Sequence, residues 1–136
     1  MLRIIIVPNL IASVLIGGIT RDRFSELVGR LDILEFIYCD QLIDEIGAFP
    51  QKAYFQKKGI DESSVKAFIT FYQAFALKVL VTSLVKVGRD RNDHYLLSLS
   101  RDARADSLIT GDPDLLLLRK YSNTQIVTMK AIIELL

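Results

Sequence analysis

The sequence predicts an α/β domain in which helices cover both faces of a parallel β-sheet. Short apolar segments alternate along the chain with stretches of helical periodicity. The apolar segments do not alternate with polar residues, as expected for strands buried on both faces. The chain has 136 residues, 51% of them hydrophobic, which is enough for one domain with its own core. We therefore expect a single three-layer domain over residues 1–136.

The chain opens with a strand that leads directly into a helix. Residues 3–7 form this strand, in which Arg3 is followed by four apolar, β-branched residues, and Pro8 breaks the run. Asn9 can then cap a helix over residues 10–16. Gly17 follows the last apolar residue and ends that helix.

The rest of the first half predicts one more strand and four helices. Apolar residues three and four apart predict a helix over residues 24–31, and residues 34–38 form the second strand. Asp40 can cap the helix that follows this strand. Two further helices are expected over residues 51–59 and 61–75.

The second half repeats the alternation of strands and helices. Each apolar run is bounded by polar or turn-forming residues. The expected strands are 79–81, 107–109 and 125–128, and the expected helices are 93–104, 112–119 and 130–136.

A loop directly after the predicted fourth strand carries an aspartate. Gly111 permits a tight turn, and Asp112 then stands at a helix start, where the helix dipole favours negative charge. Asp is also a leading N-capping residue, so the pattern leaves capping and a functional carboxylate equally open. Ligands of parallel sheets bind beyond the carboxyl ends of the strands, where we expect Asp112 to lie.

Two other carboxylates could share the same cleft. Asp93 stands at the start of a predicted helix, and Glu45 lies within the helix after the second strand. Taken singly, each is more simply a solvated surface charge. Together with Asp112 they suggest a Mg²⁺ or Mn²⁺ site, because these ions prefer oxygen ligands and relieve repulsion between carboxylates.

Other chemistries find little support in the sequence. His94 is the only histidine, which excludes most zinc sites, and no nucleophile-elbow motif accompanies it. Cys39 is the only cysteine, so no intrachain disulfide can form, which suits a cytoplasmic protein. The net charge of +1 does not indicate strong non-specific nucleic-acid binding.

Membrane attachment is not expected either. No apolar stretch reaches the ~18 residues that a membrane span needs. Pro8 and Asn9 interrupt the one N-terminal run that could pass for a signal peptide. A buried strand running into a helix is the simpler interpretation.

The chain resembles the PIN-domain family, especially the bacterial toxin components of toxin-antitoxin systems. The most specific part lies between residues 89 and 117, where RDRNDHYLL and ADSLITGDPDLL are similar to the family's RDxxDxxxL and ADxLxTGDxDLL. QLIDEI at 41–46 resembles the helix that carries a metal-site Glu. RIIIVPNLIASVLI, residues 3–16, is similar to the opening strand and helix, which usually contain D-T-N.

This resemblance implies a fold, an activity and partners. The fold is a five-stranded parallel sheet in the order 3-2-1-4-5, and the activity is Mg²⁺- or Mn²⁺-dependent cleavage of RNA. A small antitoxin protein and a homodimer are implied partners. By this resemblance, the metal-site acids of the family are Glu45, Asp93 and Asp112, and Asp114 and Asp90 are weaker candidates. Asn9 and Thr110 correspond to supporting residues of the family's site.

The departure from the family lies at Val7 and Pro8. The first metal-site Asp of the family falls at Val7, which offers no oxygen, and its Thr or Ser falls at Pro8. Three carboxylates can still bind one ion, since Mg²⁺ is often held by one or two carboxylates and water. We nonetheless expect weak metal affinity and ribonuclease activity at or near background.

Two interpretations therefore remain open. The chain is either a PIN-domain toxin scaffold weakened at the site, or a non-catalytic interaction module that keeps the fold and binds protein. Val7 favours the second, and the intact spacing from Asp93 to Asp112 favours the first. The basic residues Lys86, Arg89 and Arg91 are candidates for contacts with the RNA backbone, or simply solvated charges.

Overall fold

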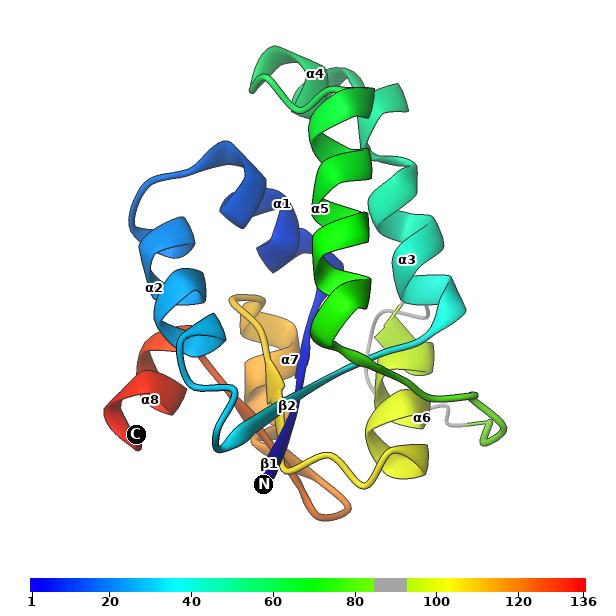
Figure 1. Cartoon of the computed structure of the whole chain (residues 1–136). Coiled ribbons are helices and arrows are strands. Elements are labelled where there is room, and N and C mark those ends of the chain that lie inside the picture. Colours follow the sequence, from blue (N-terminus) through cyan, green and yellow to red (C-terminus); the bar gives the residue numbers. More distant parts are fainter. Residues whose placement is uncertain (85–92) are drawn as a thin grey trace.

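Helices cover both faces of one β-sheet in the computed structural model, which describes residues 1–84 and 93–136 (Figure 1). Within these residues the sheet has six strands in the order β3-β2-β1-β4-β6-β5. Every neighbouring pair is parallel except β5 and β6, which are antiparallel. The strands are β1 (Leu2–Ile6), β2 (Leu34–Tyr38), β3 (Leu77–Lys78), β4 (Ser107–Ile109), β5 (Lys120–Tyr121) and β6 (Thr124–Val127).

The three-layer α/β/α class is confirmed, and the five parallel strands lie in the expected order. The predicted strand count is wrong by one, because β5 adds an antiparallel edge strand. A two-residue turn, Ser122 and Asn123, joins β5 to β6, and Ser122 has a positive φ of 54°. A strand of two residues is too short to produce a recognisable periodicity, so the sequence pattern does not reveal it.

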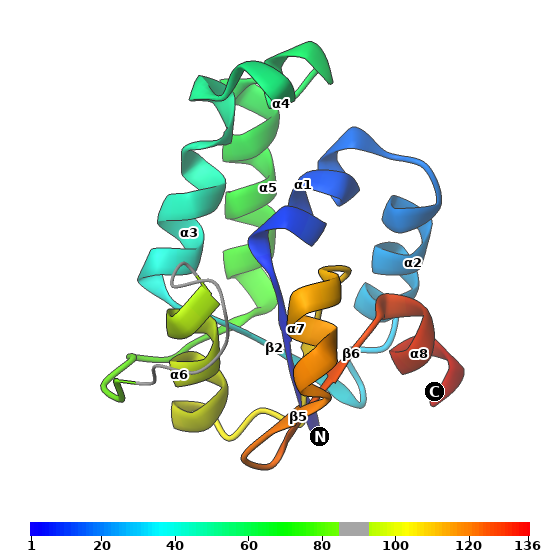
Figure 2. The same ribbon diagram turned by 180° about the vertical axis from the view of Figure 1, so that it is seen from behind.

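The helices divide between the two faces of the sheet. Helices α2 and α5 lie on one face, whereas α6 and α7 lie on the other (Figures 1 and 2). The helices are α1 (Pro8–Ile16), α2 (Ile19–Val28), α3 (Asp40–Gly47), α4 (Ala53–Lys57), α5 (Glu62–Phe75), α6 (His94–Asp102), α7 (Pro113–Leu118) and α8 (Met129–Glu134), with a 3₁₀ turn, η1 (Phe49–Gln51), before α4.

Two of the expected N-caps are wrong by one or two residues. Helix α1 is capped by Val7 and begins at Pro8, so that Asn9 lies inside the helix. Proline suits the first helical position because its missing N–H would have no partner there. Helix α3 is capped by Cys39, which leaves Asp40 in the first turn, where its carboxylate lies 3.0 Å from Nζ of Lys78.

Several element boundaries also differ from the expected ones. The single helix expected over residues 51–59 is instead the 3₁₀ turn η1 followed by the short helix α4. Helix α2 begins at Ile19, five residues before the expected start, and includes polar residues that hide its periodicity. Strand β3 comprises Leu77 and Lys78 instead of residues 79–81, because pairing with Ile37 and Tyr38 of β2 sets its register.

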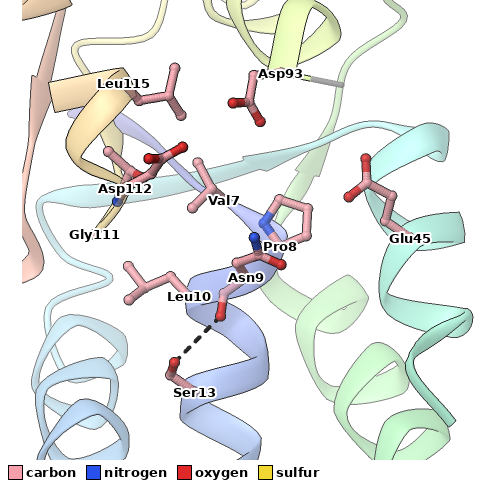
Figure 3. Close-up of a pocket in the computed structure, with 11 residues that line it drawn as sticks. Val7, Pro8, Asn9, Leu10, Ser13, Glu45, Asp93, Gly111, Asp112 and Leu115 are labelled. Atoms are coloured by element: carbon pink, nitrogen blue, oxygen red, sulfur yellow. Dashed lines mark hydrogen bonds between the residues drawn. The ribbon is translucent and has the colours of Figure 1, made fainter. Parts of the chain in front are cut away.

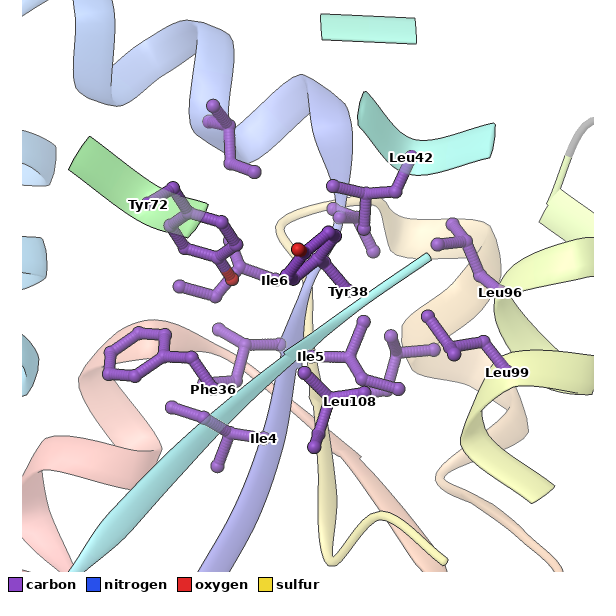
Figure 4. Packing of buried hydrophobic residues seen from close by; sticks show 14 of the residues in the cluster. Ile4, Ile5, Ile6, Phe36, Tyr38, Leu42, Tyr72, Leu96, Leu99 and Leu108 are labelled. Atoms are coloured by element: carbon purple, nitrogen blue, oxygen red, sulfur yellow. The ribbon is translucent and has the colours of Figure 1, made fainter. Parts of the chain in front are cut away.

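Strand β1 forms the centre of the core. Ile4, Ile5 and Ile6 are fully buried, and their side chains point alternately to the two faces of the sheet. Figure 4 shows Ile5 toward Leu96 and Leu99 of α6, whereas Ile4 and Ile6 lie on the side of the aromatic residues. A strand buried in this way requires apolar residues at every position, which explains the unbroken run in the sequence.

A cluster of aromatic rings fills the face of the sheet under α5. Tyr72 is fully buried, and its ring centroid lies 5.9 Å from that of Phe36 and 5.5 Å from that of Phe68. Burial raises the pKa of its phenol. Among the residues that the structure describes, its hydroxyl finds no hydrogen-bond partner.

We expect Tyr72→Phe to leave the free energy of unfolding unchanged or to raise it by about 1 kcal/mol, because the hydroxyl is desolvated without a hydrogen bond. Urea unfolding of both proteins measures the difference. Phe36→Ala, which removes a buried ring of the same cluster, should instead lower stability by about 3–5 kcal/mol. A loss above about 1 kcal/mol for Tyr72→Phe would show that the hydroxyl is bonded.

The carboxylate of Asp102, the last residue of α6, binds the segment that follows β3. The N–H groups of Thr82 and Ser83 donate to Oδ2 of Asp102 at 2.7 and 2.8 Å, and the Ser83 hydroxyl donates to Oδ1. Partial desolvation pushes the pKa of Asp102 upward, but these hydrogen bonds outweigh it and hold the pKa below its ordinary value.

Asp102→Ala should lower stability at neutral pH, by about 1 kcal/mol for the lost hydrogen bonds. A depressed folded-state pKa gives stability that is present above the unfolded pKa of about 3.9 and is lost as pH falls through the folded pKa. The difference from wild type should therefore shrink below about pH 4. Asp44→Ala, at an exposed position of α3, is the control. A difference independent of pH would argue against this role of the carboxylate.

Candidate functional site

A pocket of about 410 Å³ opens at the carboxyl edge of the parallel strands. Val7 follows the last residue of β1, and Thr110, Gly111 and Asp112 follow β4. Residues of α1 and α3 complete the wall (Figure 3). The pocket therefore lies where parallel sheets commonly bind their ligands.

Three carboxylates from three different segments line this pocket. Glu45 comes from α3, Asp93 directly precedes α6, and Asp112 directly precedes α7. Figure 3 shows Asp112 and Glu45 on opposite sides of Val7 and Pro8, with Asp93 above them. The structure thus brings together the three acids that the sequence singled out.

Asp112 serves the local structure and the pocket at once. Its Oδ1 accepts the backbone N–H of Asp114 at 3.0 Å, so it does cap α7. Its own N–H donates to Oγ1 of Thr110 at 3.0 Å, and Thr110 is buried in the pocket wall. The turn at Gly111 is therefore stabilised by two hydrogen bonds of Asp112, one with Thr110 before the turn and one with Asp114 after it.

Asp93 occupies the N-cap position of α6 without making a capping hydrogen bond to that helix. It is half-buried and lines the pocket. Simple capping, one of the interpretations open from the sequence, does not describe this side chain. Asp93 is therefore described better as part of the pocket wall than as a helix cap.

The middle of the pocket is apolar. Val7 is 4% exposed, and its N–H donates to the carbonyl of Ile109 at 3.1 Å. Pro8 is buried beside it, and Leu10 and Leu115 extend the apolar lining. Val7 and Pro8 therefore form a hydrocarbon patch between the acids.

Polar residues of α1 form another part of the wall. Asn9 lines the pocket, and its backbone carbonyl accepts the Ser13 hydroxyl at 3.4 Å. Ser13 was not singled out from the sequence, although it lies one helical turn after Asn9. That spacing of four residues is the signal that places both on one face.

Of the two weaker candidate acids, the structure describes only Asp114. Asp114 is exposed on the first turn of α7, outside the lining. Asp90 lies outside the described residues, as do Lys86, Arg89 and Arg91.

Tyr95 is a neighbour of the site that the sequence did not reveal. It is 8% exposed, and burial raises the pKa of its phenol, with a further contribution from the nearby Glu45 carboxylate. The hydroxyl is close enough to Glu45 to be affected by it, yet makes no hydrogen bond of good geometry within the described part of the chain. A tyrosine followed by buried leucines, as in HYLLSL at 94–99, resembles an ordinary core residue.

Cys39 is buried at the N-cap of α3, and desolvation raises the pKa of its thiol. A thiol with a raised pKa is a poor nucleophile and a poor metal ligand at neutral pH. Cys39 is also absent from the pocket lining, whose ionisable side chains are the carboxylates of Glu45, Asp93 and Asp112.

The donor set fits a hard divalent cation in type, since carboxylates are the ligands that Mg²⁺ and Mn²⁺ prefer. Within residues 1–84 and 93–136, no three His, Cys, Asp or Glu side chains lie close enough together to hold a metal ion. Glu45, Asp93 and Asp112 line the pocket without being close enough to one another to form such a group.

Comparison with known proteins gave no match to a family model, a curated protein or a solved structure. In the described part of the chain, no helix combines the length and the apolar character that crossing a membrane requires.

Proposed function

We propose that this chain is a PIN-domain ribonuclease scaffold of the toxin-antitoxin type, with activity at or near background because Val7 replaces a metal-site Asp. One observation carries the proposal: Glu45, Asp93 and Asp112, distant along the chain, line one pocket at the carboxyl edge of the sheet. The parallel strand order expected for the family supports it.

In this proposal the three carboxylates hold a Mg²⁺ or Mn²⁺ ion. A bound divalent ion would supply water activation and charge stabilisation for phosphodiester hydrolysis. Thr110 and the turn around Gly111 orient Asp112, and Asn9 offers an amide at the pocket wall. A small antitoxin and a second copy of the chain are the proposed protein partners.

A non-catalytic interaction module is the second candidate. The buried apolar patch of Val7 and Pro8 favours it, because this patch stands where a ligand oxygen is expected. A protein of this class would keep the sheet and bind its partner without metal.

Mn²⁺ should raise the melting temperature of the wild-type protein, because an ion that binds only the folded state stabilises it by mass action. At 100 times the dissociation constant the gain is about 2.7 kcal/mol. Glu45→Gln and Asp112→Asn should each reduce this gain, and Asn at 112 keeps the capacity to cap α7.

Asp44→Asn is the matched control, because Asp44 neighbours Glu45 on α3 but does not line the pocket. Differential scanning fluorimetry across a Mn²⁺ titration measures the effect. An identical response of Glu45→Gln and Asp44→Asn would contradict metal binding in the pocket.

The double substitution Val7→Asp and Pro8→Thr should increase Mn²⁺ affinity and produce metal-dependent RNA cleavage. Position 7 is the N-cap of α1 and makes no side-chain capping bond now, so an Asp suits its backbone. Without metal, the added buried charge should lower stability. Cleavage is followed on a labelled RNA with and without Mn²⁺.

Val7→Asn with Pro8→Thr is the control, since it adds an oxygen of similar size without the charge. Adding Glu45→Gln to the restored protein should abolish the gained cleavage. If the restored protein folds and binds Mn²⁺ but cleaves no RNA, the lost-ligand explanation for low activity is wrong.

A further inference from the structure

A second hollow adjoins the acidic pocket along α1. It has a volume of about 290 Å³ and shares Asn9 and Ser13 with the acidic pocket. Its other walls include Ile16 at the end of α1 and the aromatic residues Tyr54 and Phe55 of α4. The two hollows therefore lie next to each other along α1, with Asn9 and Ser13 in the wall of both, and together we call them the trough.

The aromatic end of this trough presents one ring to solvent and anchors another. Phe55 is half-buried, with its ring centroid 4.8 Å from that of Phe49, which is buried. Tyr54 is 64% exposed and meets Phe55 edge-on at 5.5 Å. The Tyr54 ring therefore packs against Phe55 and remains largely exposed, so that a ligand can reach it.

Positive charge surrounds these rings. Residues 51–60, QKAYFQKKGI, contain three lysines and no acid. Nζ of Lys58 lies 5.8 Å from the Tyr54 ring centroid, and Nζ of Lys52 lies 5.9 Å from that of Phe55. Acidic residues return only at Asp61 and Glu62, at the start of α5.

We propose that Tyr54 and the lysines in and beside α4 (Lys52, Lys57 and Lys58) form a binding platform for single-stranded RNA, which holds nucleotides that flank the phosphate at the acidic pocket. An exposed aromatic ring stacks bases without regard to sequence, and lysines pair with the phosphates. The acidic pocket itself repels a polyanion, so affinity must come from a neighbouring basic surface. This inference rests on the proposed function.

The trough connects the proposed platform to the acidic pocket. Because Asn9 and Ser13 belong to both hollows, a strand stacked on Tyr54 reaches the carboxylates along α1 without leaving the surface. The platform therefore sets which stretch of RNA enters the site, while Glu45, Asp93 and Asp112 act on the phosphate.

Binding is measured by fluorescence anisotropy of a labelled, unstructured 12-nucleotide RNA in EDTA, so that no cleavage interferes. Tyr54→Ala should weaken binding by about 5- to 150-fold, the range for one stacked base. Tyr54→Phe should keep the affinity within about threefold, because the ring remains. Phe71→Ala, which removes an exposed ring on α5, is the matched control and should bind as wild type.

The lysines are tested through the salt dependence of binding. Replacing Lys57 and Lys58 by Gln should reduce the slope of log affinity against log salt by about 1.4, because each phosphate contact of a single strand contributes about 0.7. The same change at Lys66 and Lys130, both exposed on other helices, should leave the slope unchanged.

The outcomes separate this inference from the proposed function. Wild-type RNA binding that is absent, or that is insensitive to Tyr54→Ala, overturns the platform. A Tyr54→Ala protein that binds RNA normally but no longer self-associates in sedimentation assigns the surface to a second copy of the chain, which also overturns it. Tyr54-dependent binding without cleavage by the restored site supports the platform and rejects the ribonuclease proposal.

Discussion

The structure depends on the parallel pairing of β1 with β2 on one side and β4 on the other. In this register Ile4 is paired with both Phe36 and Ser107, and Ile6 lies beside Ile109. Because all three strands point the same way, the residues that follow them meet at one edge. The pocket, the turn at Gly111 and the starts of α1 and α3 all follow from that shared direction.

The same constraint explains why Val7 is significant. Its N–H continues the pairing by donating to Ile109, so its position at the pocket is determined by the sheet and not by its own side chain. A carboxylate or a valine would occupy nearly the same place. The difference between them is chemical, since valine contributes packing with Pro8 and Leu115 where an Asp would contribute ligand oxygens.

The trough along α1 links two surfaces of opposite charge. Glu45, Asp93 and Asp112 gather negative charge at one end, and the lysines in and beside α4 gather positive charge at the other. A protein with a net charge of only +1 can therefore still offer a polyanion a favourable local surface. The net charge sums the acidic and the basic end of the trough, so it does not describe the charge at either end.

The sequence by itself predicted the fold class and four of the five parallel strands, because strands buried on both faces have strong local patterns. It also singled out Glu45, Asp93 and Asp112 as candidate acids. It did not determine β5, the caps at Val7 and Cys39, or the register of β3, which depend on pairing between distant segments. Only the tertiary structure decided that Tyr95 lies by Glu45, that Asp114 stays outside the pocket, and that α4 adjoins α1. Such proximity depends on how helices pack, and side-chain spacing within one helix carries no information about its neighbours.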